Sequence, residues 1–185
     1  MARFLLLLVA ASIIAGCTYY SLVPPGTREI AGTYSVKSEI PWSKATEGKT
    51  DLWTVDGMGL QELRFVNGLA DGDRLFSGEK FGEQPEYKEN MTFLEIKELI
   101  ETSAAVVGAV GVKTRDFRPH KFGNLEGFRA EFSFTTEDGL LRDGFVVGTK
   151  KDNKLYLIMY SGSRLHYFPK HKDDAEYIVR SIRVH

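Results

Sequence analysis

Apolar and polar residues alternate most clearly in the C-terminal half of the chain. Over residues 128–135, three phenylalanines and one alanine share one parity, which predicts a β-strand with its aromatic rings on one face. Asp-Gly at 138–139 and Asp-Asn at 152–153 predict turns on either side of a second strand, residues 140–149. The next run, residues 154–160, is apolar at both parities, so we expect a strand that is covered on both faces.

The N-terminal third also has the pattern of antiparallel strands. Residues 30–36 place apolar side chains mainly at one parity and predict one strand. Residues 52–55 and 60–66 flank Asp56-Gly57, which predicts a hairpin. Asn67-Gly68 predicts another turn directly after the second of these strands. We therefore expect an antiparallel ribbon here.

Two segments have helical spacing. Thr92-Phe93-Leu94-Glu95 forms a capping box, after a long loop predicted over residues 77–90. An apolar stripe follows and ends at Gly108; it contains Ile96, Leu99, Ile100, Ser103 and Val107. We interpret this stripe as core packing, with docking of a partner as the alternative. A second helix is predicted over residues 173–180.

Together these elements predict one α+β domain over residues 28–185. Two-sided cover of the strand at 154–160 requires a layer on each face of the sheet, and one helix is available for each. The predicted architecture is an α/β/α sandwich with a mainly antiparallel sheet.

The first sixteen residues have the pattern of a secretory signal. Arg3 precedes an apolar run that is too short to span a bilayer, since a spanning helix needs about 20 residues. Ile14-Ala15-Gly16-Cys17 resembles the lipobox of bacterial lipoproteins, in which the cysteine is lipidated and the signal is cut just before it. An ordinary secretory signal with a chance cysteine is the alternative. Removal of residues 1–16 leaves 169 residues with 23 cations and 25 anions, a net charge of −2.

The lipobox resemblance implies attachment to a membrane through lipid on Cys17. In bacteria with two membranes, an aspartate after the cysteine retains lipoproteins in the inner membrane; here that residue is Thr18, which implies the outer membrane, facing the periplasm. Residues 17–27 are predicted to be a short tether that contains Pro24 and Pro25. Ten extended residues reach about 35 Å at most, so the domain would stay near the bilayer.

The order of predicted elements is similar to the PsbP-like fold. This α/β/α fold is shared by an extrinsic subunit of photosystem II, a Ran-binding nuclear import factor and several bacterial lipoproteins. Short sequence words also resemble an uncharacterised proteobacterial lipoprotein family, namely Trp53-Thr54-x-Asp56-Gly57, Arg118-Pro119, Phe122-Gly123, Gly127-Phe128, Leu155-Tyr156-Leu157-Ile158 and His166-Tyr167-Phe168. Relatives with this fold mostly act as adaptors or accessory subunits, so the resemblance implies binding rather than catalysis.

Composition excludes several classes of function. The 185 residues carry 24 Lys+Arg against 25 Asp+Glu, which lacks the cationic surplus of a dedicated nucleic-acid binder. With 43% hydrophobic residues and a net charge of −1, the chain does not have the composition of a disordered protein. A single cysteine can form neither an internal disulfide nor a cysteine-rich zinc site.

No motif in the sequence specifies chemistry. Residues 108–114 resemble a phosphate loop, but only two residues separate the glycines and Val112 precedes the lysine. Asp71-Gly72-Asp73 lacks the further ligands of a calcium loop. The histidines show no metal-binding spacing. We therefore predict no catalytic, cofactor or metal site; a hydrolase built on Ser161 or Ser163 with His166 remains the rival, because a triad is defined by geometry.

One cluster is a candidate binding surface. Residues 160–168 combine aromatic and cationic side chains after the strand covered on both faces, a composition suited to recognition. The alternative is that Leu165, Tyr167 and Phe168 complete the core. The candidate surface consists of Trp53, Arg118, His120, Tyr160, Arg164, His166 and Tyr167.

The leading hypothesis is a lipid-anchored, non-catalytic envelope module that binds a protein or cell-wall partner. Besides the hydrolase, a carrier of a small apolar ligand is the other alternative. A carrier requires an enclosed apolar cavity of roughly 300 Å³ or more.

Overall fold

Eight strands form the main sheet of the protein. The computed structural model describes residues 20–76 and 83–185, and every pairing between its strands is antiparallel. The main sheet has the order β1-β4-β5-β6-β10-β9-β8-β7. Its strands are β1 Ser21–Val23, β4 Trp42–Glu47, β5 Thr50–Thr54, β6 Gln61–Leu69, β7 Val110–Phe122, β8 Leu125–Thr135, β9 Leu141–Lys151 and β10 Lys154–Ser163. The predicted antiparallel sheet is therefore confirmed.

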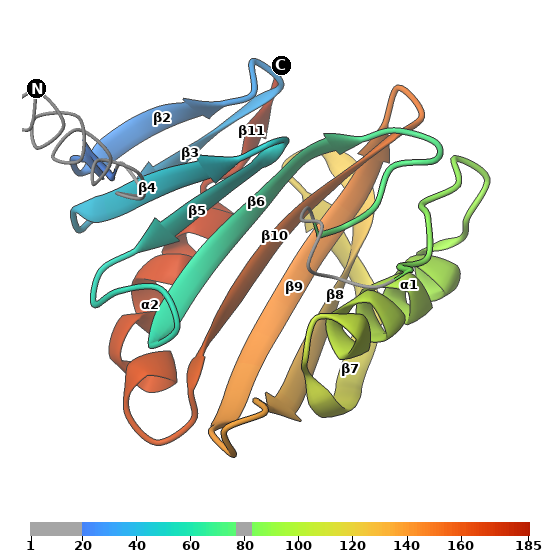
Figure 1. Ribbon diagram of the computed structural model, residues 1–185. Coiled ribbons are helices and arrows are strands. Elements are labelled where there is room, and N and C mark those ends of the chain that lie inside the picture. The colour runs from blue at the N-terminus through green and yellow to red at the C-terminus, as the bar shows by residue number, and fades with distance from the viewer. Residues whose placement is uncertain (1–19, 77–82) are drawn as a thin grey trace, which may run out of the picture.

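The two helices lie on opposite faces of this sheet. Figure 1 shows α1, Phe93–Val106, in front of the sheet and α2, Tyr167–Arg180, behind it. A second sheet packs beside α2 and has the order β11-β3-β2. Its strands are β2 Gly26–Ile30, β3 Tyr34–Ser38 and β11 Arg183–Val184. The predicted α/β/α sandwich is thus only partly right, because one outer layer is a helix and the other is a helix with a small sheet.

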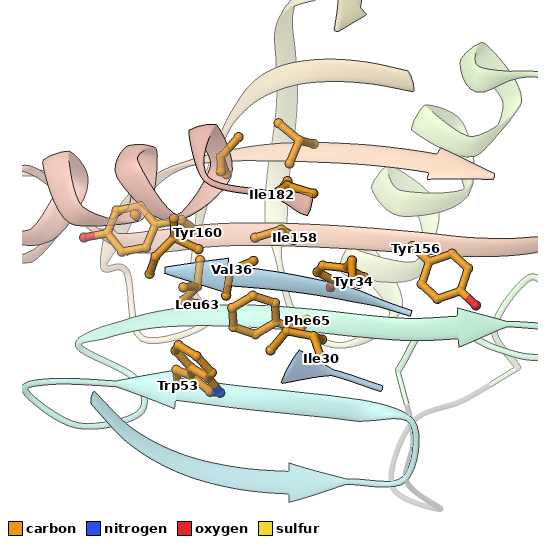
Figure 2. Close-up of a cluster of buried hydrophobic side chains, with 14 of the residues drawn as sticks. Ile30, Tyr34, Val36, Trp53, Leu63, Phe65, Tyr156, Ile158, Tyr160 and Ile182 are labelled. Atoms are coloured by element: carbon orange, nitrogen blue, oxygen red, sulfur yellow. The ribbon is translucent and has the colours of Figure 1, made fainter. Parts of the chain in front are cut away.

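The core on the α2 side, here called the α2-side core, is rich in aromatic residues. Trp42, Trp53, Tyr34, Phe65 and Tyr160 are each at most 2% exposed, and Figure 2 shows the last four of these side chains within the cluster. Trp53 packs on Phe65 with ring centroids 4.7 Å apart. Large buried rings contribute much of the hydrophobic stabilisation of a domain.

The core on the α1 side, here called the α1-side core, depends on two glycines of β9. A Cβ atom at Gly144 would lie 2.3 Å from the Phe132 ring, and one at Gly148 would lie 2.7 Å from the Phe128 ring. The two rings of β8 therefore lie over the backbone of β9. The predicted face of β8 is confirmed, since Phe128, Ala130 and Phe132 are buried in this core and Phe134 packs against it.

The predicted strand β10 is confirmed, including its cover on both faces. Leu155 and Leu157 belong to the α1-side core, whereas Tyr156, Ile158 and Tyr160 belong to the α2-side core. β10 pairs with β6 on one side and with β9 on the other, so it lies at the centre of the sheet. Successive side chains of such a strand point to opposite faces, which explains apolar residues at both parities.

One predicted strand and one predicted turn are wrong. Residues 30–36 form a hairpin rather than one strand, because Ala31 and Gly32 adopt positive φ values of 51° and 63° between β2 and β3. Asn67-Gly68 lies inside β6 and is no turn. Gly68 has a φ of +80° and is skipped in the pairing with β10, where Leu155 faces Leu69 and Tyr156 faces Asn67. It forms a bulge, which also uses the freedom of glycine at positive φ.

The first helix is confirmed in detail and the second only in part. Thr92 caps α1 through a complete capping box with Glu95, and the helix ends in front of Gly108, which has a φ of +96°. Ile96, Leu99, Ile100 and Ser103 of its stripe are buried. α2 begins at Tyr167 rather than Asp173, after His166, whose side chain makes no capping hydrogen bond. α2 opens with Tyr167, Phe168 and Pro169 and has no side-chain cap, so the sequence carries no capping signal at its start.

The tether is shorter than the predicted residues 17–27. Ser21–Val23 pairs with β4 at the edge of the main sheet, and Val23 is 6% exposed, so the chain joins the domain from Ser21 onward. The signal, Cys17 and part of the loop at 77–90 lie outside the described residues. Within residues 20–76 and 83–185, no helix is both long enough and apolar enough to cross a bilayer.

Candidate functional site

Two residues of the predicted binding surface lie in the core. Trp53 is 2% exposed and Tyr160 is fully buried. The Tyr160 hydroxyl donates to backbone carbonyls of Tyr167 and Phe168 at 3.1 and 2.9 Å, so it anchors the start of α2. Both residues were wrong as surface candidates, because their strands are covered by the small sheet and α2. Their role is structural.

The remaining candidates are divided between distant parts of the sheet. His120 and Arg118 on β7 face Gly127 and Arg129 of β8. By contrast, Arg164, His166 and Tyr167 follow β10, whose last pairings lead through β9 to Phe134 at the other end of β8. Gly127 and Phe134 are seven residues apart, roughly 23 Å along a strand. The predicted surface is therefore not assembled as one site.

The polar groups after β10 are engaged within the fold. Arg164 makes a two-pronged ion pair with Asp143, with N–O distances of 2.8 and 2.7 Å, and the hydrogen bonds raise the pKa of its guanidinium. The Ser161 hydroxyl accepts from Arg142 at 3.1 Å, and the Ser163 hydroxyl lies 3.5 Å from the Tyr167 N–H that donates to it. The His166 ring packs edge-on against Tyr167.

The other motifs have structural explanations. Residues 108–114 comprise the end of the connection after α1 and the first residues of β7. Asp73 accepts from the Ala70 N–H at 2.7 Å and pairs with Lys49. These interactions lower the pKa of Asp73, with the Lys49 hydrogen bond as the largest cause. In the described part of the chain, no three His, Cys, Asp or Glu side chains converge on a point that could hold a metal ion.

A cleft between α1 and the sheet, here called the α1 cleft, is a large concave feature of the described residues. Its volume is about 570 Å³, and it is partly open to solvent. The floor is formed by five neighbouring strands of the main sheet, in the order β6, β10, β9, β8 and β7. The C-terminal half of α1 forms the roof. Its apolar lining includes Ile100, Ala104, Val107, Phe132, Phe134 and Met159.

The cleft exists because α1 covers only part of the apolar face below it. Ile96 and Leu99, near the start of the helix, are buried in the α1-side core. Val107, the last residue of the stripe, is only half-buried and lines the cleft instead. On the floor, the Phe132 and Phe134 rings stack with centroids 6.2 Å apart. The stripe predicted to pack in the core thus does so at Ile96, Leu99, Ile100 and Ser103 but not at Val107.

Two ion pairs lie in the walls of the cleft. Lys97 and Glu101 on α1 are 2.9 Å apart, and Arg64 and Glu62 on β6 are 3.5 Å apart. Burial raises the pKa of Glu101, but hydrogen bonds from Thr114 and Lys97 outweigh it, so the net pKa is lowered. Glu101 is therefore held as a carboxylate beside an apolar space.

Three further carboxylates lie at the rim without a cation beside them. Glu47, Glu137 and Asp138 line the cleft, and none of them is within 4.0 Å of a Lys, Arg or His nitrogen of the described residues. Glu137 lies against Gly108, where a Cβ atom would be 3.2 Å from Oε1. A hydrogen bond from Thr136 lowers the pKa of Asp138. The rim is therefore acidic.

Sequence reasoning missed this site. Its residues come from α1, from β4, β6, β7, β8, β9 and β10 and from the loops between them, and no single motif gathers them. The only available signal was the amphipathic stripe of α1, whose apolar face could have docked a partner instead of packing in the core. A cavity depends on how far a helix is displaced along a sheet, which periodicity does not specify.

Comparisons with known proteins identify the fold. No protein-family model and no curated protein matches the chain. The solution structure of cyanobacterial PsbP (CyanoP) from Synechocystis matches 93% of this chain and 96% of its own length, with 12% identity and a TM-score of 0.56. At such identity the likeness shows the fold alone, and it confirms the predicted PsbP-like fold.

Two further solved structures are similar at lower TM-scores. A crystal structure from Bacteroides thetaiotaomicron matches 87% of this chain with 12% identity and a TM-score of 0.49, and the chain spans 49% of that protein's length. The crystal structure of LpqN, described as involved in cell envelope biogenesis of Mycobacterium tuberculosis, matches 92% of this chain and 87% of its own length, with 8% identity and a TM-score of 0.39.

Proposed function

We propose that this protein is a lipid-anchored, non-catalytic component of the cell envelope that binds a small ligand with an apolar body in the α1 cleft. The observation that carries the proposal is the apolar cleft of about 570 Å³ between α1 and the sheet. Ligand sites in proteins have volumes of roughly 300–1,000 Å³ and are lined mainly by apolar side chains. The cleft is partly open, whereas the carrier hypothesis expected an enclosed cavity, but its volume and apolar lining favour the carrier over the other two hypotheses.

The packing of the protein supports an occupant for this space. Protein interiors are close-packed, and voids larger than a water molecule are few. The other face of the same sheet follows this rule, with its largest side chains almost fully buried. An unfilled apolar cleft leaves Phe132, Phe134 and Met159 without packing partners on one side. A ligand that supplies those contacts gains the free energy of burying apolar surface.

The proposed lack of catalytic activity rests on the surroundings of the serine and histidine side chains that could have formed a hydrolase site. Ser161 lies at the cleft and accepts a hydrogen bond from Arg142, a cation. Among the described residues its hydroxyl donates to no histidine that could remove its proton. His166 packs on Tyr167 beyond the end of β10. A hydrolase would instead need the hydroxyl, a base and an orienting group within hydrogen-bond reach of one another.

Binding can be tested with N-phenylnaphthylamine, an uncharged apolar dye whose fluorescence rises in apolar surroundings. We expect the protein to raise its fluorescence in a saturable manner. Ala104→Trp places an indole in the cleft and should abolish this rise, whereas Ala105→Trp, at the exposed neighbouring position of α1, should leave it unchanged. An unaltered protein that does not bind the dye, or equal binding by both variants, would contradict the proposal.

The lipid anchor is proposed from the resemblance of residues 14–17 to a lipobox. Several acyl chains, at about 0.8 kcal/mol per buried methylene, suffice for stable anchoring. Cys17→Ser should release the protein from membranes or leave it unprocessed, and fractionation with mass spectrometry of the N-terminus measures both. A Cys17→Ser protein that fractionated with membranes as the processed form would exclude the anchor. The outer membrane is proposed from Thr18 and is tested by separating the two membranes.

A further inference from the structure

We propose that the ligand of the α1 cleft is a cationic amphiphile, with its apolar body between α1 and the sheet and its positive head group at the rim beside Glu137 and Asp138. This inference rests on the proposed function and names its ligand class. The shape and lining of the cleft select the apolar body. The charge of the head group follows from the distribution of carboxylates around the cleft.

The lining carries a net negative charge. It includes five carboxylates and two cations, which gives a net charge of −3, whereas the whole chain has a net charge of only −1. The two cations are paired, Lys97 with Glu101 and Arg64 with Glu62. The uncompensated charge therefore belongs to Glu47, Glu137 and Asp138. A concave site lined by one sign of charge raises the local concentration of ligands of the opposite sign.

The end of α1 adds to this negative field. The C-terminus of a helix carries a partial charge of about −0.5, and cations near it are stabilising. α1 has no basic residue in its last turn, and its end is occupied by the carboxylate of Glu137 against Gly108. This arrangement places two like charges together and costs stability within the protein. A cationic group bound here would relieve it.

A third cation near the floor does not reverse this conclusion. Arg142 lies behind Ser161, buried at 4% exposure, and donates to Ser161 and to the Gly59 carbonyl. Its guanidinium also interacts favourably with Glu62. Arg142 is therefore enclosed near the floor, with its guanidinium 5.9 Å from the centroid of the Phe134 ring, and it donates hydrogen bonds within the fold. The rim at α1 remains acidic.

Three probes with the same decyl chain separate the charge from the apolar body. They are decyltrimethylammonium, decyl glucoside and decyl sulfate, each kept below its micelle concentration. By calorimetry or displacement of the dye, we expect the ammonium to bind at least about tenfold more tightly than the sulfate, with the glucoside between them. The preference should shrink in about 1 M salt, where the Debye length is only about 3 Å.

Two sets of variants locate the effect. Glu137→Gln with Asp138→Asn should remove most of the preference for the ammonium probe while keeping the binding of decyl glucoside. Glu98→Gln is the matched control, because Glu98 is an exposed carboxylate of α1 outside the cleft lining. This variant should prefer the ammonium probe over the sulfate probe as strongly as the unaltered protein does. Ala104→Trp should weaken all three probes, since it fills the space that the decyl chain takes.

The outcomes distinguish this inference from the proposed function. Equal binding of all three probes, or tighter binding of the sulfate, overturns the cationic head group and leaves the apolar ligand in place. A preference that persists in the Glu137→Gln, Asp138→Asn protein overturns the assigned position of the head group. Failure of every probe to bind overturns both proposals together.

Discussion

The two faces of the central sheet differ in how completely they are filled. On the α2 side, the helix and the small sheet cover the strands, and α2 is fastened by polar contacts as well. Asp174 accepts from the Trp42 indole at 2.9 Å and from the Glu39 N–H at 2.7 Å. On the α1 side, the first residues of the helix pack on the sheet, and its last residues roof a cleft of about 570 Å³.

This difference in packing would let one sheet serve both stability and the proposed binding. A filled apolar face contributes free energy of folding, and a partly open face gives up some of that free energy, which a bound ligand would restore. Adjacent residues of β10 belong to different faces, so the two roles can be tested independently.

The largest expected difference is in the loss of stability caused by alanine substitutions at two neighbouring positions of β10. Ile158 is fully buried in the α2-side core, and Met159 is half-buried at the cleft. Ile158→Ala should lower the free energy of unfolding by about 2–5 kcal/mol, because it leaves a cavity in packed surroundings. Met159→Ala should cost less than about half as much, because the cleft already exposes that side chain. Urea denaturation measures both; similar losses would show that the faces are equally packed.

The polar attachment of α2 is the next largest effect. Asp174→Ala leaves the buried Trp42 indole and the Glu39 N–H without their acceptor. Hydrogen bonds to charged groups contribute about 1.5–3 kcal/mol, so we expect a loss of that size in chemical denaturation. Asp173→Ala, at the exposed preceding position, is the control and should change stability little. A loss equal in both variants would point to helix propensity instead.

On the α1 side, the corresponding polar attachment is the capping box. Thr92→Ala removes the hydroxyl that accepts from the Glu95 N–H at 3.3 Å. The loss of an N-cap costs about 1 kcal/mol, so the melting temperature should fall modestly. Hydrogen exchange should rise first in the opening turn of α1. If exchange rose equally in α2, the two helices would unfold together rather than separately.

The smallest effect depends on pH and concerns the hairpin that touches α2. Hydrogen bonds from Lys170, and then from His171, lower the pKa of Asp56. Because this pKa is depressed in the folded state, the stabilisation is complete above the unfolded pKa and is lost as pH falls through the folded one. Asp56→Asn should reduce stability by less than about 1 kcal/mol near neutral pH, as is usual for a partly exposed ion pair. The difference from the unaltered protein should shrink as the pH falls below about 3.9, the unfolded pKa of an aspartate.

Sequence patterns predicted the elements whose burial is periodic. The alternation at residues 128–135 and the two-sided strand β10 were clear, because their neighbours on both sides fix which face is buried. β7 was not predicted as a long strand. It lies at the sheet edge and is exposed along most of its length, with bulges near Gly111 and Asp116, so it needs no apolar parity. β4 was missed because it lies near the other edge.

The candidate site was harder to predict than the fold. Aromatic and cationic residues near His166 indicated recognition, but Tyr160 supports the core and Arg164 is paired with Asp143. Composition does not tell whether a polar group is engaged within the fold. The α1 cleft arises from the offset of a helix over a sheet, and from Gly144, which lets the Phe132 ring lie flat on β9. Such features are properties of packing rather than of local sequence.

The pairing of β6 with β10 also determines when the chain can fold. Phe65 and Ile158 face each other at the centre of the sheet although 93 residues separate them, and Arg183 of β11 completes the small sheet opposite Ser35. Contacts between distant residues close large loops and slow folding. β6 can therefore gain β10 as its neighbour only after β10 has been synthesised, and neither core is complete around β6 before that point.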